Sequence, residues 1–451
     1  MRCTVAQQLP LVPDVVDHAH AALLDRMGRV LDAVPQLAEA VSADLVANCD
    51  AHVGRPGLTA DQVLRVFVLK QMTRASYERL AFHLADSATY ARFCRIALSS
   101  STPRRSSLQE NVQRVRPETW EAVNSELLRH AIDLGVDDGS RVRGDCTVVD
   151  AAIHRPSDST LLWDCVRVLV RLMKHALEHV DFEMRDHLRS AKRRMLSIGQ
   201  ARSKDERRPL YRDLLRVTDQ TAAYARDALE ALRVRSRRLR SDRRRRPLQK
   251  LATKLESYLE LTAQVLDQAR RRVILGQSVP ADEKVLSIFQ PQVDLIVKDR
   301  IDSRFGHKVA LIVGASGLVF DFKIVEGNPN DSTLAVPMIE RVREVLGKSP
   351  AQAVFDGGFT SRANLEKIKT MNVRDVVFTS RRGIPLEEMT DSRASFESLR
   401  KFRAGVEGVI SILKRGFGLG RCTFRGHISF ATYCLGSVLA HNLWLIARTA
   451  D

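Results

Sequence analysis

Three acidic residues that lie far apart in the sequence could together bind metal ions. Asp145 lies within RVRGDCTVV (141–149), a β-branched run that predicts a strand. Asp356 ends the buried-strand pattern of QAVFDGG (352–358), and Glu407 lies in a segment with helical periodicity. Mg²⁺ prefers carboxylate oxygens, and two such ions about 4 Å apart activate a nucleophilic oxygen and stabilise a leaving oxygen in phosphodiester chemistry. The three carboxylates therefore predict a two-metal site.

Each of these acids also has a purely structural explanation. A strand aspartate among apolar neighbours is costly without a partner, yet either Asp145 or Asp356 alone could form a turn or a cap. Arg403, Glu407 and Lys414 are spaced by four and seven residues, so they share one stripe of a helix. Such a stripe could hold a metal through its acid while its cations bind phosphates, or it could be an exposed face with ordinary ion pairing.

The N-terminal region has a helical pattern throughout. From about residue 14 to residue 135, apolar side chains recur at three-to-four spacing, which predicts an all-α domain at residues 1–135. Thr59 is the expected N-cap of the helix that begins in LTADQVLRVF. Several short helices joined by polar turns could form a helix-turn-helix that binds DNA ends, or a bundle without DNA contact.

After this domain the pattern changes twice. The first strand and its flanks (140–160) precede a long helical stretch at 161–278, and residues 279–451 then alternate strands and helices. Within that last region, KVALIVGA (308–315) and VFDFKIVEG (319–327) predict a hairpin. The order is strand, helical insertion, strand, strand, helix, strand, helix, strand, helix. It predicts an α/β core of the ribonuclease-H-like class, with a mixed sheet flanked by helices and a long α-helical insertion after the first strand.

Net charge is the clearest compositional feature. The 451 residues include 71 Lys or Arg against 54 Asp or Glu, a net charge of +17, and a polyanion is the usual partner of such a surface. Nucleic acid is the first expectation, although some basic proteins contact anionic membranes or ribosomes, or are simply soluble. Residues 181–275 hold 26 basic and 13 acidic residues, so most of the excess lies in the helical insertion.

The insertion contains RVRSRRLRSDRRRR (233–246), with nine arginines and one aspartate. So much like charge predicts a solvated tip between two antiparallel, coiled-coil-like helices. The run could be an exposed cluster without a specific partner, or it could contact DNA, because Arg pairs well with phosphate oxygens. On the second hypothesis the DNA-binding residues of the tip are Arg237, Arg238, Arg240, Arg243, Arg244, Arg245 and Arg246.

Simpler observations exclude other classes of protein. The seven cysteines are scattered and form no C-x-x-C pair, which argues against a disulfide framework or a zinc ribbon, so we expect reduced thiols. The N-terminus lacks the sustained apolar stretch of a secretory signal, and no apolar run approaches the roughly 20 residues that span a bilayer. We therefore expect a cytoplasmic protein without a membrane partner.

Three blocks, in this order, resemble the signature blocks of the DDE transposases of bacterial insertion sequences, in the broad group related to the ISNCY elements. They are GDCTVVDAAIHRPSDSTLLWDCVRVL, FDGGFTSRANLEKI and RKFRAGVEGVISILKRGFGLGR. The third block matches the Arg-x3-Glu-x6-Lys part of the motif known as YREK, as Arg403, Glu407 and Lys414. At the tyrosine position this sequence has Arg400, so a tyrosine contact with DNA is not expected. Three further segments also resemble parts of this group of transposases. They are FGHKVALIVG, EGNPNDSTL and LTADQVLRVFVLKQMTRASYERLAFHLADS, and the whole resemblance spans residues from about 59 to 450.

The resemblance implies a transposase and endonuclease whose catalytic and metal-binding residues are Asp145, Asp356 and Glu407. Its cofactor would be Mg²⁺, two ions per site, with Mn²⁺ able to replace it. Water activated at the site would nick the ends of the element, and the released 3′-hydroxyl would then attack target DNA. The expected partners are double-stranded DNA, as terminal inverted repeats and target, and a second copy of the chain in a synaptic homodimer associated with the nucleoid.

DNA contacts are expected from three regions. The basic C-terminal segment, with Arg400, Arg403, Lys414 and Arg421, would hold phosphates together with the arginine-rich tip. The N-terminal helices would recognise the terminal repeats. Two rival functions fit the same residues: a metal-dependent nuclease without strand transfer, and a catalytically silent DNA-binding derivative.

Two further polar positions have open interpretations. Lys308, like His307 beside it, could contact substrate from the second strand or could face solvent. Asn328, Asn330 and Asp331 most simply form a turn and cap the helix that follows.

Overall fold

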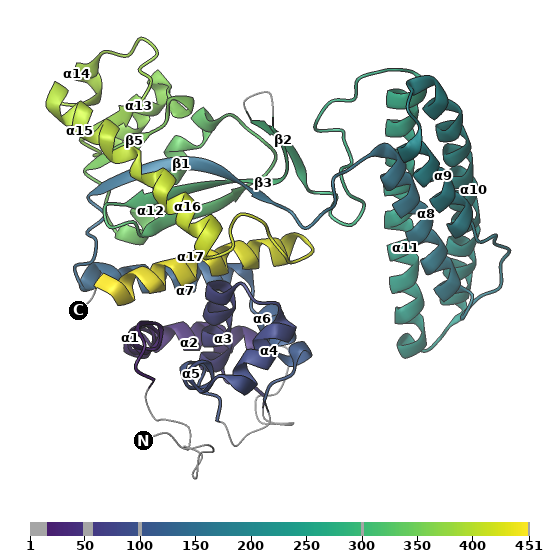
Figure 1. Ribbon diagram of the computed structural model, residues 1–451, viewed down its shortest axis with the longest axis horizontal. Helices are drawn as coiled ribbons and strands as arrows, with labels where there is room; N and C mark the ends of the chain where they lie inside the picture. Colours follow the sequence, from purple (N-terminus) through teal and green to yellow (C-terminus); the bar gives the residue numbers. More distant parts are fainter. Residues whose placement is uncertain (1–15, 48–56, 98–101, 299–301, 450–451) are drawn as a thin grey trace, which may run out of the picture. The chain divides into compact units, whose positions relative to one another are not determined.

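The chain folds into two compact units, each around an apolar core of its own (Figure 1). The computed structural model describes residues 16–47, 57–97, 102–298 and 302–449. The first unit consists of residues 1–152 and 307–451, and the second consists of residues 153–306.

Helices account for the secondary structure of the described N-terminal part of the first unit, as the apolar spacing predicts. They are α1 (Ala19–Ala33), α2 (Gln36–Val46), α3 (Ala60–Thr73), α4 (Tyr77–Asp86), α5 (Ala88–Phe93), α6 (Arg105–Arg114) and α7 (Pro117–Asp133). Thr59 is the N-cap of α3, as expected, and forms a capping box with Gln62. Residues 63–71 of α3 are all buried, and the Phe67 ring packs against Trp120 of α7 with centroids 4.5 Å apart. The α3 helix is therefore the centre of this bundle.

A six-stranded mixed sheet carries two of the candidate acids. Its strands are β1 (Arg141–Asp150), β2 (Asp294–Lys298), β3 (Asp302–Gly314), β4 (Val319–Val325), β5 (Gln352–Phe355) and β6 (Asp375–Phe378). The strand order is β2-β3-β1-β5-β6, and β4 pairs with β3. The β5 strand runs parallel to β1 and β6, whereas β2 and β4 are antiparallel to β3. The hairpin predicted from 308–315 and 319–327 is confirmed.

The β2 strand was not predicted, and β3 begins earlier than its apolar run. The first half of β3 pairs with β2, from Asp294 opposite Gly306 onward, and the second half pairs with β4. Polar residues such as Arg304 interrupt the alternation in the first half of β3, so only its apolar second half has a strand pattern.

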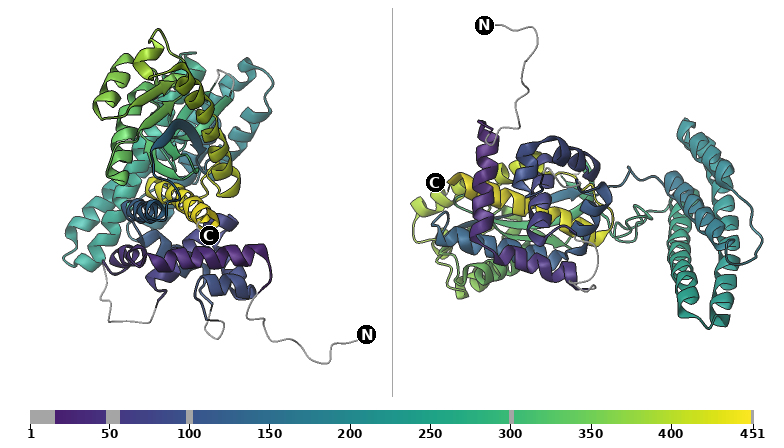
Figure 2. Two further views of the ribbon diagram at one scale, coloured as in Figure 1. Left: turned by 90° about the vertical axis from the view of Figure 1, so that its left-hand side faces the viewer. Right: turned by 90° about the horizontal axis from the view of Figure 1, so that it is seen from below.

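Short and long helices surround the sheet. They are α12 (Ala335–Leu346), α13 (Arg362–Thr370), α14 (Leu386–Met389), α15 (Arg393–Arg403), α16 (Gly405–Gly416) and α17 (His427–Thr449), with the 3-10 turns η2 (Asp331–Thr333) and η3 (Gly357–Phe359). The α17 helix runs beside α7 and also contacts α1, α3 and β4 (Figures 1 and 2). A Cβ on Gly436 would lie 2.2 Å from the Phe67 ring, so a glycine is needed where α17 approaches α3. This helix thus joins the N-terminal bundle and the sheet in one core.

The α17 helix corrects the expectation that no apolar run is long enough to span a bilayer. It has 23 residues with a mean hydropathy of 1.3 over its most apolar window, and 83% of that window is buried inside the protein. Within the described ranges it is the one helix that could cross a membrane by length and composition. A helix enclosed by its own protein is apolar on every side, which gives the same composition as a membrane span.

The second unit is mainly helical; in the sequence it begins after β1 and ends within β3. Its helices are α8 (Asp158–Ala176), α9 (Leu188–Gln200), α10 (Lys204–Arg238) and α11 (Asp242–Ala269), followed by one π-helical turn, η1 (Arg270–Ile274). Leu248, Leu251 and Leu255 of α11 are buried in the core that α8, α10 and α11 share. The arginine-rich run 233–246 spans the turn between α10 and α11, where most of its side chains are exposed, so it is a hairpin tip as predicted.

Candidate active site

Asp145 and Asp356 are brought together by two neighbouring parallel strands. The register pairs Gly144 of β1 with Phe355 of β5; Asp145 is the next residue within β1, and Asp356 directly follows the end of β5. A Cβ on Gly144 would lie 2.4 Å from the Phe355 ring, so this glycine allows the strands to pack at that point. The local sequences GD and FD therefore place two carboxyl groups at the same edge of the sheet.

Asp145 is largely buried, with a side chain that is 14% exposed. Its Oδ1 accepts a hydrogen bond from the Cys146 backbone N–H at 2.8 Å. Burial raises the pKa of this carboxyl group above its ordinary value, the nearby guanidinium of Arg403 opposes the shift, and the negative charges of Asp356 and Asp331 add to it. A carboxylate in this position needs a compensating cation to stay ionised.

Asp356 is more open, with a side chain that is 48% exposed. It is the N-cap of η3, and its Oδ1 accepts hydrogen bonds from the Gly357 backbone N–H at 2.7 Å and from the Thr379 hydroxyl at 3.0 Å. These two bonds fix the orientation of the carboxylate. Its Oδ2 lies 3.6 Å from a guanidinium nitrogen of Arg403.

Arg403 links all three predicted acids. Its Nη2 lies 2.9 Å from Asp145 Oδ2 and 3.6 Å from Asp356 Oδ2, and its Nη1 donates to Glu407 Oε1 at 2.8 Å. The arginine side chain is only 16% exposed. Carboxylates from β1, from the end of β5 and from α16 therefore converge on a single positive charge.

The predicted helical stripe of Arg403, Glu407 and Lys414 is divided between two helices. Arg403 is the last residue of α15, and Glu407 lies in the first turn of α16 after a break at Ala404. The Glu407 side chain is 67% exposed, so it is the most accessible of the three acids. Arg403, which was predicted to contact DNA, forms ion pairs with these carboxylates.

The donor set fits hard divalent cations. The donor atoms are carboxylate oxygens, one from within β1, one from the residue after β5 and one from α16. These carboxylates lie around one positive charge, the guanidinium of Arg403. The three carboxylates do not form a closer group, since within the described ranges only a different trio of side chains brings its ligand atoms within 4.8 Å of one another. A two-metal site has room for that spacing, because its ions are themselves about 4 Å apart and need not share every ligand.

A fourth carboxylate, that of Asp331, lies beside this site, and its position there was not predicted from the sequence. Asp331 was predicted to cap a helix, but its Oδ1 lies 2.5 Å from Lys308 Nζ. A Cβ on Gly358 would lie 3.0 Å from Asp331 Oδ2, so the acid sits against the turn that follows Asp356. The predicted capping role of Asp331 is wrong. No side-chain hydrogen bond caps the η2 turn, and the Asp331 carboxylate contacts Lys308.

The other predicted DNA-binding residues lie outside the carboxylate cluster. Arg400 is exposed and pairs with Glu397 at 2.8 Å, Lys414 is partly buried, and Arg421 is exposed. At the insertion tip the side chains of Arg237, Arg238, Arg240, Arg243, Arg244 and Arg246 are exposed, and Arg245 is partly buried beside Asp242.

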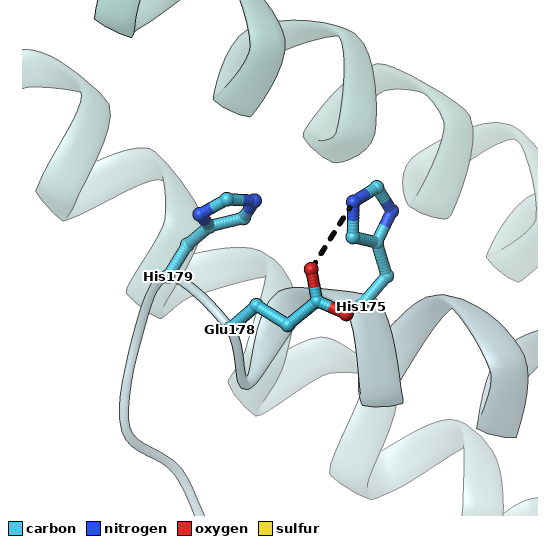
Figure 3. A group of neighbouring side chains, drawn as sticks. All are labelled: His175, Glu178 and His179. Atoms are coloured by element: carbon cyan, nitrogen blue, oxygen red, sulfur yellow. Dashed lines mark ion pairs between the residues drawn. The ribbon is translucent and has the colours of Figure 1, made fainter.

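A separate trio of potential ligands lies at the end of α8. Figure 3 shows His175, Glu178 and His179, all exposed, with a histidine nitrogen 3.8 Å from a Glu178 oxygen. Two imidazoles and one carboxylate suit Zn²⁺ or a similar transition metal better than Mg²⁺. The trio is therefore a poor alternative to the carboxylate cluster as a magnesium site.

Two family models match the chain. One, described as "Transposase DDE domain", matches residues 297–443, and the other, described as "Transposase domain (DUF772)", matches residues 14–114. The first range includes Asp356 and Glu407, whereas β1 with Asp145 precedes it. A DDE domain implies a ribonuclease-H-like fold, which agrees with the mixed sheet and its helices. Neither the curated proteins nor the solved structures gave a match.

Proposed function

We propose which residues of this chain carry out its chemistry, and how they do so. The chain belongs to the DDE transposases of bacterial insertion sequences. Asp145, Asp356 and Glu407 are the catalytic triad and hold two Mg²⁺ ions, for which Mn²⁺ can substitute. The reaction is cleavage at the ends of the element followed by transfer of the 3′-hydroxyl into target DNA.

One observation supports this assignment above all others. Three acids that are remote in the sequence share the single guanidinium of Arg403, at distances of 2.8 to 3.6 Å. An ordinary surface ion pair joins two groups, and its net contribution is small. A cluster with more carboxylates than cations has an excess of negative charge, and it attracts further cations.

Each residue has a distinct part in the proposed chemistry. When bound, the ions lower the pKa of the attacking water or hydroxyl and stabilise the leaving oxygen. Asp145 supplies a ligand from a rigid, mostly buried strand, and the Thr379 and Gly357 hydrogen bonds orient Asp356. Glu407, which is mostly exposed, supplies the third ligand from the open side of the site.

DNA is held mainly by phosphate contacts in this proposal. The exposed arginines of the insertion tip and the basic segment with Arg400, Lys414 and Arg421 bind the backbone of the duplex, so binding weakens steeply as salt rises. The N-terminal helices recognise the terminal inverted repeats. Two copies of the chain act together, because two DNA ends must be joined to one target.

The test is a strand-transfer assay with labelled duplexes that carry the element's own end. The parent chain with Mg²⁺ is expected to nick an intact end and to join a precut end with a free 3′-hydroxyl to target DNA. Asp356→Asn should do neither, while Glu366→Gln, which removes an exposed acid from α13, should match the parent.

The products separate this proposal from its rivals. Nicking without joined product from a precut end would identify a nuclease instead. DNA binding without any cleavage in Mg²⁺ or Mn²⁺ would identify a silent DNA-binding derivative.

A further inference from the structure

A cavity of about 520 Å³ opens at the short turn between α3 and α4. The side chains that line it include His20, Arg74, Ser76, Arg79, His83 and Tyr90. None of the described residues that line it is acidic. We propose that this cavity binds a backbone phosphate of duplex DNA, which makes the α3–α4 turn a DNA clamp of the N-terminal domain. The inference rests on the proposed function, because it assumes that DNA is the substrate.

The two arginines of the cavity are available for a ligand. Arg74 and Arg79 are exposed, and neither forms an ion pair within the described part of the chain. Other arginines of the same domain are neutralised, since Arg65 and Arg95 both pair with Asp32, at 2.6 and 2.5 Å. Guanidinium groups without a carboxylate partner suit phosphate, whose oxygens accept two parallel N–H bonds from one arginine.

The backbone also favours an anion here. Arg74 is the C-cap of α3 and has a φ of 52°, a left-handed conformation that side-chain-bearing residues seldom adopt. Such strained positions concentrate at ligand sites. The ten-residue helix α4 begins directly afterwards, and the partial positive charge of its first turn lies beside Ser76 and Arg79 of the lining.

One acid and two aromatic groups complete the surroundings. Glu78 lies in the first turn of α4, but its side chain is exposed and does not line the cavity. On the opposite side, the His20 ring packs edge-on against Tyr90 with centroids 5.9 Å apart. The Nε2 atom of His20 is buried and has no hydrogen-bond partner within the described part of the chain.

The cavity adjoins the segment that follows the helix of Glu407. Arg74 Cγ lies 3.7 Å from the position that a Cβ on Gly418 would take. The Phe424 ring stacks on Tyr77 with centroids 5.8 Å apart, and the Lys70 ammonium lies 5.0 Å from the Tyr77 ring and 4.8 Å from the Phe424 ring. These packed contacts connect the α3–α4 turn to the catalytic part of the same unit. A phosphate held at the turn would therefore position DNA relative to the triad.

The test measures the affinity of the full chain for a labelled duplex of random sequence at salt concentrations from about 50 to about 200 mM. The variant is Arg74→Gly with Arg79→Ala, because glycine removes the charge at Arg74 and accepts its positive φ. The control is Arg29→Ala with Arg105→Ala, which removes two exposed charges from α1 and α6. The cavity variant should bind at least about ten-fold more weakly and lower the slope of log affinity against log salt by about 1.

Several outcomes decide the inference. The control should keep the parent's slope, and Arg79→Lys alone should retain most of the affinity, because it keeps the charge on an exposed helical position. Equal losses in the variant and the control would overturn the inference and leave the proposed function intact. Binding of inorganic phosphate to the parent but not to the variant, without loss of DNA affinity in the variant, would assign the cavity to a free anion and overturn the inference too. A parent chain that binds no DNA would contradict the proposed function itself.

Discussion

The carboxylate cluster and the arginine-rich tip concentrate charge in opposite ways. In the cluster, Asp145, Asp356 and Glu407 share the one guanidinium of Arg403. At the tip, between α10 and α11, the arginines far outnumber the acids, and most are exposed. An excess of carboxylate attracts metal ions, whereas an excess of exposed arginine attracts polyanions. The proposed function therefore places bond cleavage in one unit and a large share of DNA binding in the other.

Burial makes this contrast sharper. The Asp145 and Arg403 side chains are 14% and 16% exposed, so their interaction is weakly screened by salt. The arginines of the tip are exposed, and their attraction to phosphate falls as salt rises. A higher salt concentration should therefore weaken DNA binding, and it should have a much smaller effect on the rate at which bound DNA is cut.

The largest effect is expected from removing one charge in the carboxylate cluster. Asp145→Asn should lower the cleavage rate at saturating DNA on the order of 10³-fold, because metal stabilisation of the transition state supplies several kcal/mol and about 1.4 kcal/mol corresponds to ten-fold. DNA affinity in the absence of metal should not fall. A single-turnover cleavage assay checks both parts, and a variant that cuts at half the parent's rate or better would remove Asp145 from the triad.

The next effect concerns the tip. Replacing Arg243, Arg244 and Arg246 by alanine should weaken duplex binding roughly 10- to 100-fold near physiological salt and lower the salt slope by about 0.9 for each lost phosphate contact. The cleavage rate at saturating DNA should stay the same. The matched variant with three lysines should restore most of the affinity, since it keeps the charge. An unchanged salt slope for the alanine variant would show that the tip does not contact DNA.

A smaller effect is expected from the hydroxyl that orients Asp356. Thr379→Val removes the 3.0 Å hydrogen bond to Oδ1 while it keeps the side-chain shape. Groups that orient metal ligands typically change metal affinity or activity by about 10- to 100-fold, so the Mg²⁺ concentration at half-maximal cleavage should rise by about 10-fold. Thr370→Val, on a hydroxyl that bonds only within its own helix end, is the control. The same Mg²⁺ requirement in both variants would contradict the proposed role of Thr379.

The smallest effect is on folding stability. Burial raises the pKa of Asp145, so the folded chain keeps this proton to a higher pH than the unfolded chain does. The contribution of this group to the free energy of unfolding is therefore present at low pH and is lost as the pH rises through the folded-state pKa. In EDTA at neutral pH, Asp145→Asn should melt at a higher temperature than the parent, and the difference should shrink as the pH falls toward about 4. A lower melting temperature for the variant would mean that attraction to Arg403 outweighs the cost of burial.

Much of the fold could be predicted because its patterns are local. The β1 strand, the β3–β4 hairpin and the Thr59 cap follow from residues that are neighbours in the sequence. The sequence analysis placed Asp145 near the middle of one strand and Asp356 at the end of another, but the distance of these two acids from Glu407 could not be predicted. That distance depends on a helix break at Ala404 and on the direction of Arg403.

Other features depend on contacts that no local pattern contains. Asp331 looks like a capping residue in EGNPNDSTL, and only the fold brings Lys308 to it. The α17 helix has the composition of a membrane span because the bundle and the sheet enclose it. In each case the residue types were visible in the sequence, whereas their partners were set by tertiary packing.

The most direct test of the account is the position of bound Mn²⁺, located by anomalous X-ray scattering from crystals of the chain with a DNA end. The account predicts two peaks among the carboxylates of Asp145, Asp356 and Glu407, next to the bond that is cut. Density confined to the exposed His175, Glu178 and His179 group, with those three carboxylates free of metal, would contradict it.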